Sequence, residues 1–361
     1  MFSALTRRQW LALAVVVVAS AAAGVMHYTH VAGTTTFPVA TIALAGMAWV
    51  VSFATHALST HFGPGLTGVI QSTLGNLPEL FVVVFALRDG QVVVAQTSII
   101  GSLFANALLV LGVVIIAGAW RSPGKVMRFK PRLPNDTSTL LIMAVFLITV
   151  LGVAVGTGDK AAQHAKTISA MGAVLLLIVY FTWLYSYLKA DVAESAAEEP
   201  DAGDEELAAV MPLSGALTML AVAGAGAAFV SDWFVASLQP AIHSLHLSQA
   251  FAGLVVVAIA GNAVENVAGI TLAWKGKTDE AISVVKNSVS QIAVFLFPVL
   301  VLISLLFAAH LTFVLAPVYI AAMLITALAM WQVTGDGEAT VFEGAALVSL
   351  YVMLGILTFY E

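Results

Sequence analysis

GNLPELFVVVFALRDG (residues 75–90) returns later in the chain as GNAVENVAGITLAWKG (residues 261–276). The two stretches share Gly and Asn at the start, Glu at the fifth position and Gly at the end, all 186 residues apart. Ser102 and Ser288 extend the match at the same separation. Polar identities at one spacing, without gaps, indicate an internal duplication of the chain.

The composition around this duplication is that of a membrane protein. Of the 361 residues, 60% are hydrophobic and only 9% are charged, whereas a soluble domain carries about 25% charged residues. The chain has no cysteine, which excludes disulfides and thiolate-bound metals. Most of the net charge of -6 comes from eight acids in residues 191–206, namely Asp191, Glu194, Glu198, Glu199, Asp201, Asp204, Glu205 and Glu206.

Apolar runs long enough to cross a bilayer, which takes about 20 residues, predict eleven transmembrane helices. The runs are continuously apolar and do not alternate with polar residues, so membrane β-strands are excluded. The expected fold is therefore an all-α polytopic membrane protein. The eleven runs lie at about 9–27, 37–57, 65–87, 91–118, 137–156, 167–189, 209–231, 247–274, 279–306, 311–333 and 339–360.

The basic residues predict the orientation of these helices. If the N-terminus is inside, ten Lys and Arg fall in inner segments and three in outer segments. Because cytoplasmic loops are enriched in Lys and Arg, we expect a cytoplasmic N-terminus, an outer C-terminus and a cytoplasmic acidic loop. The inner set is Arg7, Arg8, Arg121, Lys125, Arg128, Lys130, Arg132, Lys189, Lys275 and Lys277; the outer set is Arg88, Lys160 and Lys166.

The two copies of the repeat are expected to run in opposite directions, because five crossings, an odd number, separate their spans. Inverted repeats with a binding site at the midplane are the plan of secondary transporters. The expected organisation is one extra N-terminal helix in 1–36, a first five-helix repeat in 37–189, an acidic cytoplasmic linker in 190–208 and a second five-helix repeat in 209–361.

Glu79 and Glu265 lie inside apolar spans, where a charge costs about 2.5–3.5 kcal/mol by insertion scales. Asn76 and Asn262 precede them by three residues and so share their helix faces. Structural glutamates, neutralised by protonation or by helix-end amides, are the alternative interpretation. The repeated Asn–Glu pair favours a functional site.

Around the first copy, Gly75 and Pro78 flank Asn76 and are expected to loosen the helix, which frees backbone carbonyls in a protein-lined cavity. Carboxylate, amide and carbonyl oxygens are the six to eight hard ligands that calcium takes at about 2.3–2.6 Å. These faces carry no cysteine and no histidine, so they are poorly suited to binding zinc or copper.

A second set of polar residues lies on the following spans. Ser102 and Asn106 are four residues apart, and Ser288 and Gln291 three apart, so each pair shares a helix face. A serine in a membrane helix also commonly bonds its own backbone, which is the alternative for either serine. The predicted cation ligands are Asn76, Glu79, Ser102, Asn106, Asn262, Glu265, Ser288 and Gln291.

These residue types predict an antiporter and not an enzyme. One divalent cation or a pair of protons can neutralise the two glutamates, so ion and proton compete for the same charge. An empty, doubly ionised site is expensive to carry across the bilayer, which penalises uncoupled return. No resident cofactor is expected, since calcium is the transported substrate.

The residues at 75–112 resemble the first signature of the cation/proton exchanger (CAX) family of calcium/proton antiporters, in the calcium/cation antiporter superfamily, and those at 261–302 resemble the second. The resemblance extends to 62–76, 230–242 and 336–355. It implies an extra helix, two inverted five-helix halves and an acidic linker. It also implies that the eight ligands named above handle calcium and protons.

Three positions depart from that family pattern. His56 stands where Glu is usual, Asn266 replaces a His, and Asn287, after Lys286, replaces a Gly. His56 is either a proton relay or a histidine at a helix end. Lys286 is expected to snorkel to the interface or to pair with an acid. Glu343 and Asp336 are interpreted as boundary and packing residues.

Other functions stay open at this point. A sodium/calcium exchanger of the same superfamily differs in needing sodium, and a cation channel, built on a ring of acids, would ignore a proton gradient. A membrane scaffold needs no buried glutamates. The acidic loop is interpreted as a solvated linker, with electrostatic attraction of calcium as the alternative. We expect calcium and protons as substrates, lipid as the surrounding partner and no binding of nucleic acid. A homo-oligomer is left open. The expected location is a bacterial plasma (inner) membrane.

Overall fold

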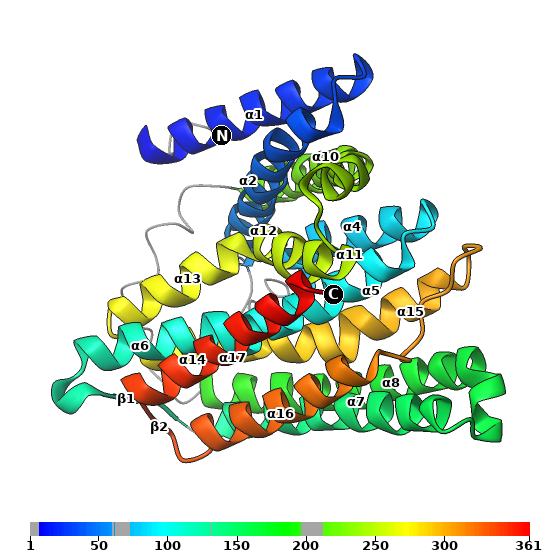
Figure 1. Cartoon of the computed structure of the whole chain (residues 1–361). Helices are drawn as coiled ribbons and strands as arrows, with labels where there is room; N and C mark the ends of the chain where they lie inside the picture. Colours follow the sequence, from blue (N-terminus) through cyan, green and yellow to red (C-terminus); the bar gives the residue numbers. More distant parts are fainter. Residues whose placement is uncertain (1–6, 60, 62–72, 131, 196–211) are drawn as a thin grey trace. The chain divides into compact units, whose positions relative to one another are not determined.

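The computed structural model describes residues 7–59, 61, 73–130, 132–195 and 212–361. Within these ranges the regular elements are helices, apart from one ribbon of two short strands, as Figure 1 shows. This confirms the all-α expectation.

Contacts within the chain define two compact units. The first joins Met1–Phe85 with Phe181–Leu247, and the second joins Ala86–Tyr180 with Ser248–Glu361. Each unit takes segments from both sides of the acidic linker, whose residues 196–208 lie outside the described part. The boundaries of the two sequence repeats stay a prediction.

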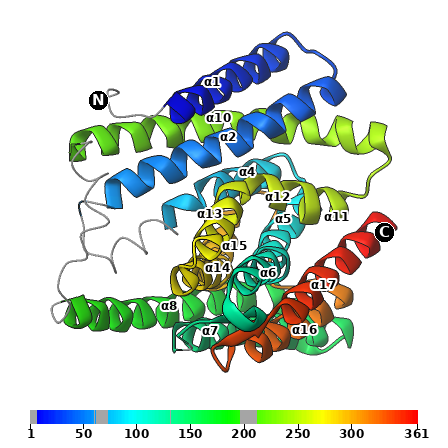
Figure 2. The ribbon, with the colours of Figure 1, turned by 90° about the vertical axis from the view of Figure 1, so that its left-hand side faces the viewer.

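The first unit is built around two antiparallel helices. Phe37 lies against Phe234, with ring centroids 5.5 Å apart, whereas further along the first helix Met47 lies against Gly226. The residue numbers of the contacts rise along the first helix and fall along the second, so the two helices are antiparallel. Figure 2 shows a third helix, α1, beside them. The described elements are α1 (Arg7–Tyr28), α2 (Gly33–Ser59), α10 (Leu213–Leu245), the start of α4 (Leu77–Arg88) and the end of α8 (Ala165–Ser195).

The second unit holds the remaining described elements. Besides the rest of α4 and α8, these are α5 (Val92–Phe104), η1 (Ala105–Val110), α6 (Leu111–Arg121), η2 (Pro123–Lys125), β1 (Val126–Arg128), α7 (Arg132–Gly156), η3 (Lys160–His164), α11 (Gln249–Phe251), η4 (Ala252–Val257), α12 (Ala258–Gly261), α13 (Ala263–Trp274), α14 (Thr278–Gln291), η5 (Ile292–Leu296), α15 (Phe297–Ser304), α16 (Pro317–Thr334), β2 (Glu338–Thr340) and α17 (Val341–Phe359).

Two long helical stretches form the centre of the second unit. The first runs through α5, η1 and α6, and the second through α14, η5 and α15; 83% and 72% of their apolar windows are buried, against at most 44% in the other membrane-length helices. They begin at Val92 and Thr278, 186 residues apart, and each contains a π-helix. α14 packs against η1 and α6, whereas η5 packs against α5, so the two stretches are antiparallel. The duplication is therefore visible in the elements themselves.

Among the described residues, nine helices are long and apolar enough to cross a membrane, and they match nine of the eleven predicted spans. The predicted span at 247–274 is instead broken at Asn262 into a stretch ending at Gly261 and the separate helix α13. The predicted span at 65–87 falls partly on residues outside the described ranges; its described part is residues 73–75 and α4. A hydropathy pattern predicts that such a segment is apolar and long enough to span, but it does not predict a helix break within the segment.

A short ribbon ties together several helix ends of the second unit. β1 and β2 pair antiparallel, with Met127 opposite Ala339. The carbonyl of Arg128 accepts a 2.7 Å hydrogen bond from the hydroxyl of Thr278, the first residue of α14. The C-terminal end of α6 and the starts of α14 and α17 are thus fixed at one end of the unit.

Candidate cation-binding site

The helix is broken at both repeated asparagines. Asn76 and Asn262 are turn residues, and α4 and α13, each 12 residues long, begin directly after them. The predicted break is confirmed, yet it forms in the second copy without the proline of the first. There, the Asn262 Nδ2 donates to the carbonyl of Ala258, four residues back, at 2.9 Å. A side chain that competes for this carbonyl disfavours further helix.

The two glutamates occupy the same place in their helices. Glu79 is the third residue of α4 and Glu265 the third residue of α13. The N-terminal turn of a helix favours negative charge, because its N–H groups have no intrahelical partners and the helix dipole is positive there. Glu79 is buried, at 5% exposure. The side chain of Glu265 lies outside what the structure describes.

A buried polar cluster joins Ser102, Asn106 and Asn262 in the second unit. The Asn262 Nδ2 donates to the Ser102 Oγ at 2.9 Å, and the Asn106 Nδ2 donates to the Asn262 Oδ1 at 2.8 Å. All three side chains are at most 1% exposed. All three are among the predicted cation ligands, and the structure brings these three into contact. The Ser102 hydroxyl therefore accepts a hydrogen bond from a residue outside its own helix.

Glycines allow this cluster to form, because α5 and η4 approach each other closely. A Cβ added to Gly101 would lie 2.5 Å from the Cα of Leu254, and one added to Gly253 would collide with Thr97. Any larger residue would separate the two elements. The close approach brings Ser102, next to Gly101, within reach of the asparagine that follows α12.

Asn106 offers an oxygen to a ligand. Its Oδ1 is buried and accepts no hydrogen bond from any described atom, while its Nδ2 makes two, to Asn262 and to the carbonyl of Ser102. A buried acceptor left without a donor is costly, and a cation would satisfy it. Asn106 is also the second residue of the π-helix η1, an irregularity that is frequent at functional sites.

Ser288 and Gln291 are buried on α14, at 1% and 3% exposure. α14 packs against η1, the element that carries Asn106. Gln291 directly precedes the π-helix η5, and Asn106 is the second residue of the π-helix η1. Both residues therefore lie at the start of a π-helix. The structure thus places both residues in the unit that holds the cluster.

Asn76 and Glu79 belong to the other unit, so their meeting with the cluster stays a prediction. Asn76 is buried at 3% exposure. Of the three departures from the family pattern, the side chains of His56 and Asn266 lie outside the described part. Within that part, no group of three or more His, Cys, Asp or Glu gathers as a metal site would require.

Lys286 does not snorkel, and that expectation is wrong. Its side chain is fully buried, at 0% exposure, and its Nζ donates to the hydroxyls of Ser138 and Thr334. Hydroxyls on neighbouring helices satisfy the amine inside the protein, so it has no need to reach the interface. The sequence did not predict these two hydroxyl acceptors, because serine and threonine in membrane helices usually bond their own backbone.

Glu343 and Asp336 are boundary residues, as expected. Glu343 forms a capping box with Thr340 at the start of α17, accepting from the Thr340 backbone N–H at 2.8 Å. Asp336 accepts a 3.1 Å hydrogen bond from the backbone of Glu338 in the turn before β2.

Comparison with known proteins agrees with this architecture. A family model described as sodium/calcium exchanger protein matches residues 32–189 and 215–360. The Ca(2+)/H(+) antiporter of Aphanothece halophytica is 30% identical over 93% of this chain and 92% of that protein. The Ca(2+)/H(+) antiporter of Synechocystis sp. is 29% identical over 93% of both chains.

A solved structure supports the fold. The match to the solved structure of native YfkE covers 97% of this chain and 100% of that chain, with a TM-score of 0.80 and 26% identity. The chain is therefore an integral membrane protein and a transporter, and the resemblance first seen in residues 75–112 and 261–302 is confirmed. It belongs to the sodium/calcium exchanger protein family.

Proposed function

We propose that this chain exchanges calcium for protons across a membrane, with its inverted repeats alternating the access of one site. The observation that carries the proposal is the buried cluster of Ser102, Asn106 and Asn262, whose last member precedes Glu265 by three residues. The cluster has oxygen ligands and a helix break, which suit a hard cation. The relatives named Ca(2+)/H(+) antiporters, similar over nearly the whole chain, support the same substrates.

The proposed ligands are the eight predicted from the sequence. Glu79 and Glu265 supply two negative charges, which balance one calcium ion. Protonation of both carboxyl groups balances the same charge without the ion, so calcium and protons exclude each other. Because the unloaded site carries two charges through a low-dielectric region, return without cargo is disfavoured. Mutually exclusive binding of calcium and protons, together with disfavoured return of the empty site, is sufficient for exchange.

Support for Glu79 and Asn76 in this site comes from the repeat. Both stand 186 residues before their counterparts, and both start a helix of the same length at the same position. In the inverted-repeat plan, such matching half-helix starts face the cargo. The eight ligands are Asn76, Glu79, Ser102, Asn106, Asn262, Glu265, Ser288 and Gln291.

Sodium/calcium exchange is the second candidate, favoured by the description of the matching family model. The two candidates differ in one requirement. A sodium-coupled protein moves calcium only in exchange for sodium, whereas a proton-coupled protein moves calcium when no sodium is present.

The proposed setting is a bacterial plasma membrane with the N-terminus in the cytoplasm. Support comes from the ten basic residues of the inner segments against three in the outer ones. In this orientation calcium leaves the cell as protons enter.

The test uses everted membrane vesicles in sodium-free buffer, with an internal proton gradient reported by a pH-sensitive dye. Addition of calcium is expected to dissipate the gradient, and calcium is expected to enter the vesicles. Vesicles carrying the Glu79→Gln variant serve as the matched control. An unchanged dye signal, together with calcium movement that appears only when sodium is added, would establish the sodium-coupled alternative.

A further inference from the structure

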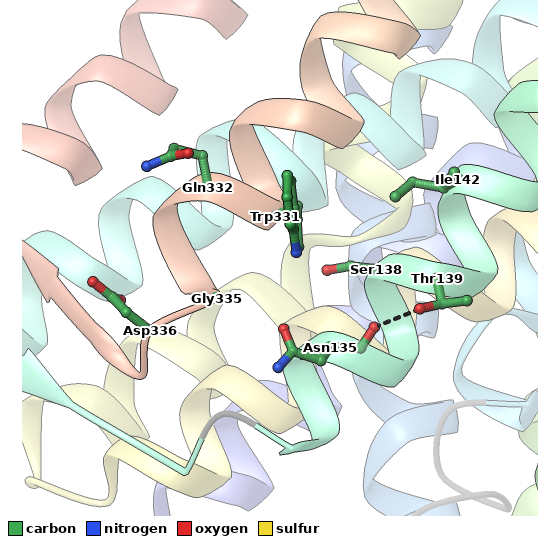
Figure 3. Close-up of a pocket in the computed structure, with 8 residues that line it drawn as sticks. All are labelled: Asn135, Ser138, Thr139, Ile142, Trp331, Gln332, Gly335 and Asp336. Carbon is green, nitrogen blue, oxygen red and sulfur yellow. Dashed lines mark hydrogen bonds between the residues drawn. The ribbon is translucent and has the colours of Figure 1, made fainter.

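A pocket of about 390 Å³ lies between the start of α7 and the end of α16, and eight described residues line it. Figure 3 shows Trp331 between the side chains of α7 and those of Gln332 and Asp336. None of the eight is a proposed cation ligand, so the pocket is a separate feature of the second unit. The residues are Asn135, Ser138, Thr139 and Ile142 from α7, and Trp331, Gln332, Gly335 and Asp336 from α16 and the turn after it.

One side of the pocket suits a positive charge. Of the eight described residues that line it, Asp336 alone is charged. Its Oδ1 accepts from the backbone N–H of Glu338, and within the described part of the chain Asp336 forms no ion pair. Trp331 lines the same pocket and is 52% exposed. An ammonium group bonds a carboxylate strongly and is attracted to the face of an indole ring, so these two side chains together favour an organic ammonium.

The other polar groups of the pocket are neutral. Asn135 and Gln332 are exposed and carry amide N–H donors, which suit phosphate oxygens. The Thr139 hydroxyl is already used, since it donates to the carbonyl of Asn135 at 3.0 Å. A free anion would meet the Asp336 carboxylate with no basic side chain among the described lining residues to offset it. The lining therefore matches a zwitterionic group that carries both an ammonium and a phosphate.

From the pocket an exposed apolar seam continues along both helices. Ile142 shares the pocket with Trp331, whereas further along α7 Gly152 lies against Ile320, so the two helices are antiparallel neighbours. Apolar residues three or four apart, and therefore on one face of each helix, are at least 39% exposed. They are Ile142, Phe146 and Val150 on α7, and Leu324, Leu328 and Trp331 on α16. This seam is a surface on which a hydrocarbon chain fits.

The pocket lies at the depth of lipid headgroups. Asp336 leads directly into β2, and β2 pairs with β1 in the loop that carries Arg121, Lys125 and Lys130. This loop is on the side predicted to be cytoplasmic, because of its basic residues. A molecule with a zwitterionic head in the pocket and a hydrocarbon chain along the seam is a phospholipid of that leaflet.

We propose that the pocket and the seam bind one phosphatidylethanolamine molecule. Its ammonium group contacts Asp336 and Trp331, its phosphate accepts from the amides of Asn135 and Gln332, and one acyl chain lies along α7 and α16. Any bilayer lipid covers the apolar seam, so the polar lining of the pocket is what selects this one. The inference is independent of the proposed calcium/proton exchange, since no cation ligand takes part in it.

The bound lipid bridges two helices that are also joined inside the protein. The Nζ of Lys286, on α14, donates to the Ser138 Oγ of α7 at 2.8 Å and to the Thr334 Oγ1 of α16 at 2.7 Å. A lipid that holds α7 against α16 from outside supports the same three-helix junction. Because it binds the folded chain, it is expected to raise the midpoint of thermal unfolding.

The first test is native mass spectrometry of the detergent-purified chain with equal amounts of phosphatidylethanolamine and phosphatidylglycerol of the same acyl chains. One phosphatidylethanolamine per chain is expected to stay bound at collision energies that remove phosphatidylglycerol, whose headgroup has no ammonium. Equal retention means annular contact only, and preferential retention of phosphatidylglycerol means attraction to the basic loops; either result overturns the proposal. Soluble phosphoethanolamine separates headgroup from lipid: if it displaces the bound lipid at equal concentration, the seam has no role and the lipid assignment is wrong.

Two variants locate the site. Asp336→Asn keeps the size of the side chain and an oxygen for the Glu338 N–H but removes the charge, and it is expected to weaken phosphatidylethanolamine binding about tenfold. Trp331→Leu keeps an apolar side chain without the ring and is expected to weaken it about threefold. The matched controls, Glu280→Gln and Trp274→Leu, change exposed residues outside the pocket and are expected to bind as the wild type does. Wild-type binding by Asp336→Asn overturns the site.

Thermal unfolding in detergent gives a second readout that needs no transport. Added phosphatidylethanolamine is expected to raise the midpoint of the wild type and of both controls, and to leave that of Asp336→Asn unchanged. If a variant does not fold, the wild type alone decides the question through the N-acetyl derivative of the same lipid, which keeps the phosphate and the chains but lacks the positive charge. This derivative is expected to be retained no better than phosphatidylglycerol. Retention and stabilisation equal to those of phosphatidylethanolamine would overturn the role of the ammonium group.

Discussion

Asn106 donates a 2.8 Å hydrogen bond from its Nδ2 to the Oδ1 of Asn262, across 156 residues of sequence. The bond joins a π-helix in one half of the chain to a helix break in the other. Asn262 is then held in place by two further bonds, to Ser102 and to its own helix. The amide that precedes Glu265 is thereby fixed before any ion arrives, which lowers the cost of ordering the site on binding.

Ser102→Ala tests this cluster directly. The change leaves a buried amide proton of Asn262 without an acceptor, which costs about 1–3 kcal/mol. We expect the apparent calcium affinity to fall by about tenfold, since 1.4 kcal/mol is a factor of ten.

The matched control is Ser98→Ala, on the same helix, because the Ser98 hydroxyl bonds the carbonyl of Val94 in its own backbone. Calcium uptake by this variant is expected to resemble the wild type. Equal losses in both variants would remove Ser102 from the site.

Gly101→Ala tests the close approach of α5 and η4. The added methyl group would lie 2.5 Å from the Leu254 Cα, so the two elements must separate. Overpacking of this kind costs about 1–3 kcal/mol, and thermal unfolding in detergent should show a lower midpoint together with weaker calcium binding. At Gly156, where an added Cβ meets nothing within 4 Å, the same change should alter neither. A Gly101→Ala protein of normal stability and affinity contradicts this packing account.

Glu343→Gln tests the interpretation of a carboxylate outside the site. Glu343 completes a capping box with Thr340 at the start of α17, and glutamine can take the same place because its amide oxygen also accepts from the Thr340 N–H. We therefore expect a small fall in thermal stability and a calcium affinity within about twofold of normal. Loss of transport without loss of stability would make Glu343 a functional group.

The acidic linker is expected to be dispensable for the transport step. Replacing the acids of 191–206 with Ser and Gln should leave the maximal rate of calcium uptake unchanged. The half-saturating calcium concentration should rise at low salt and not at high salt, because steering by exposed charges is screened. A variant with no transport at any calcium concentration would place the loop in the mechanism.

The sequence was sufficient for the repeat, for nine membrane-spanning helices among the described residues and for the members of the cluster. Asn262 and Ser102 could be named because each is a polar residue at a repeated position in an apolar span, and Asn106 because it shares the helix face of Ser102. The π-helices could not be predicted, since ANALLV and IAVFL differ from ordinary helix only in their backbone hydrogen bonds. Nor could the break at Asn262, which lacks the proline of its counterpart.

The partners of Lys286 escaped prediction for a related reason. Ser138 lies 148 residues before it in the sequence and Thr334 lies 48 residues after it. A long-range side-chain bond leaves no periodic pattern in the sequence, whereas the amphipathic length of a lysine suggests snorkelling. Only the packing of α7 and α16 beside α14 reveals that the amine has acceptors inside.

The central claim is that Glu79 and Glu265 together balance one calcium ion, and calcium uptake by their glutamine variants tests it most directly. Each change keeps the size and one oxygen ligand but removes a charge and a proton site. Uptake is measured in sodium-free proteoliposomes under an imposed pH gradient, over a range of calcium concentrations, with Glu343→Gln as the matched control.

Removing one partner of a buried charge pair costs about 3–5 kcal/mol, so we expect each single variant to lose at least a hundredfold in apparent affinity. Both should keep a normal unfolding midpoint, and the double variant should be no worse than either. Near-normal rate and affinity in Glu79→Gln or in Glu265→Gln would contradict the paired-carboxylate mechanism.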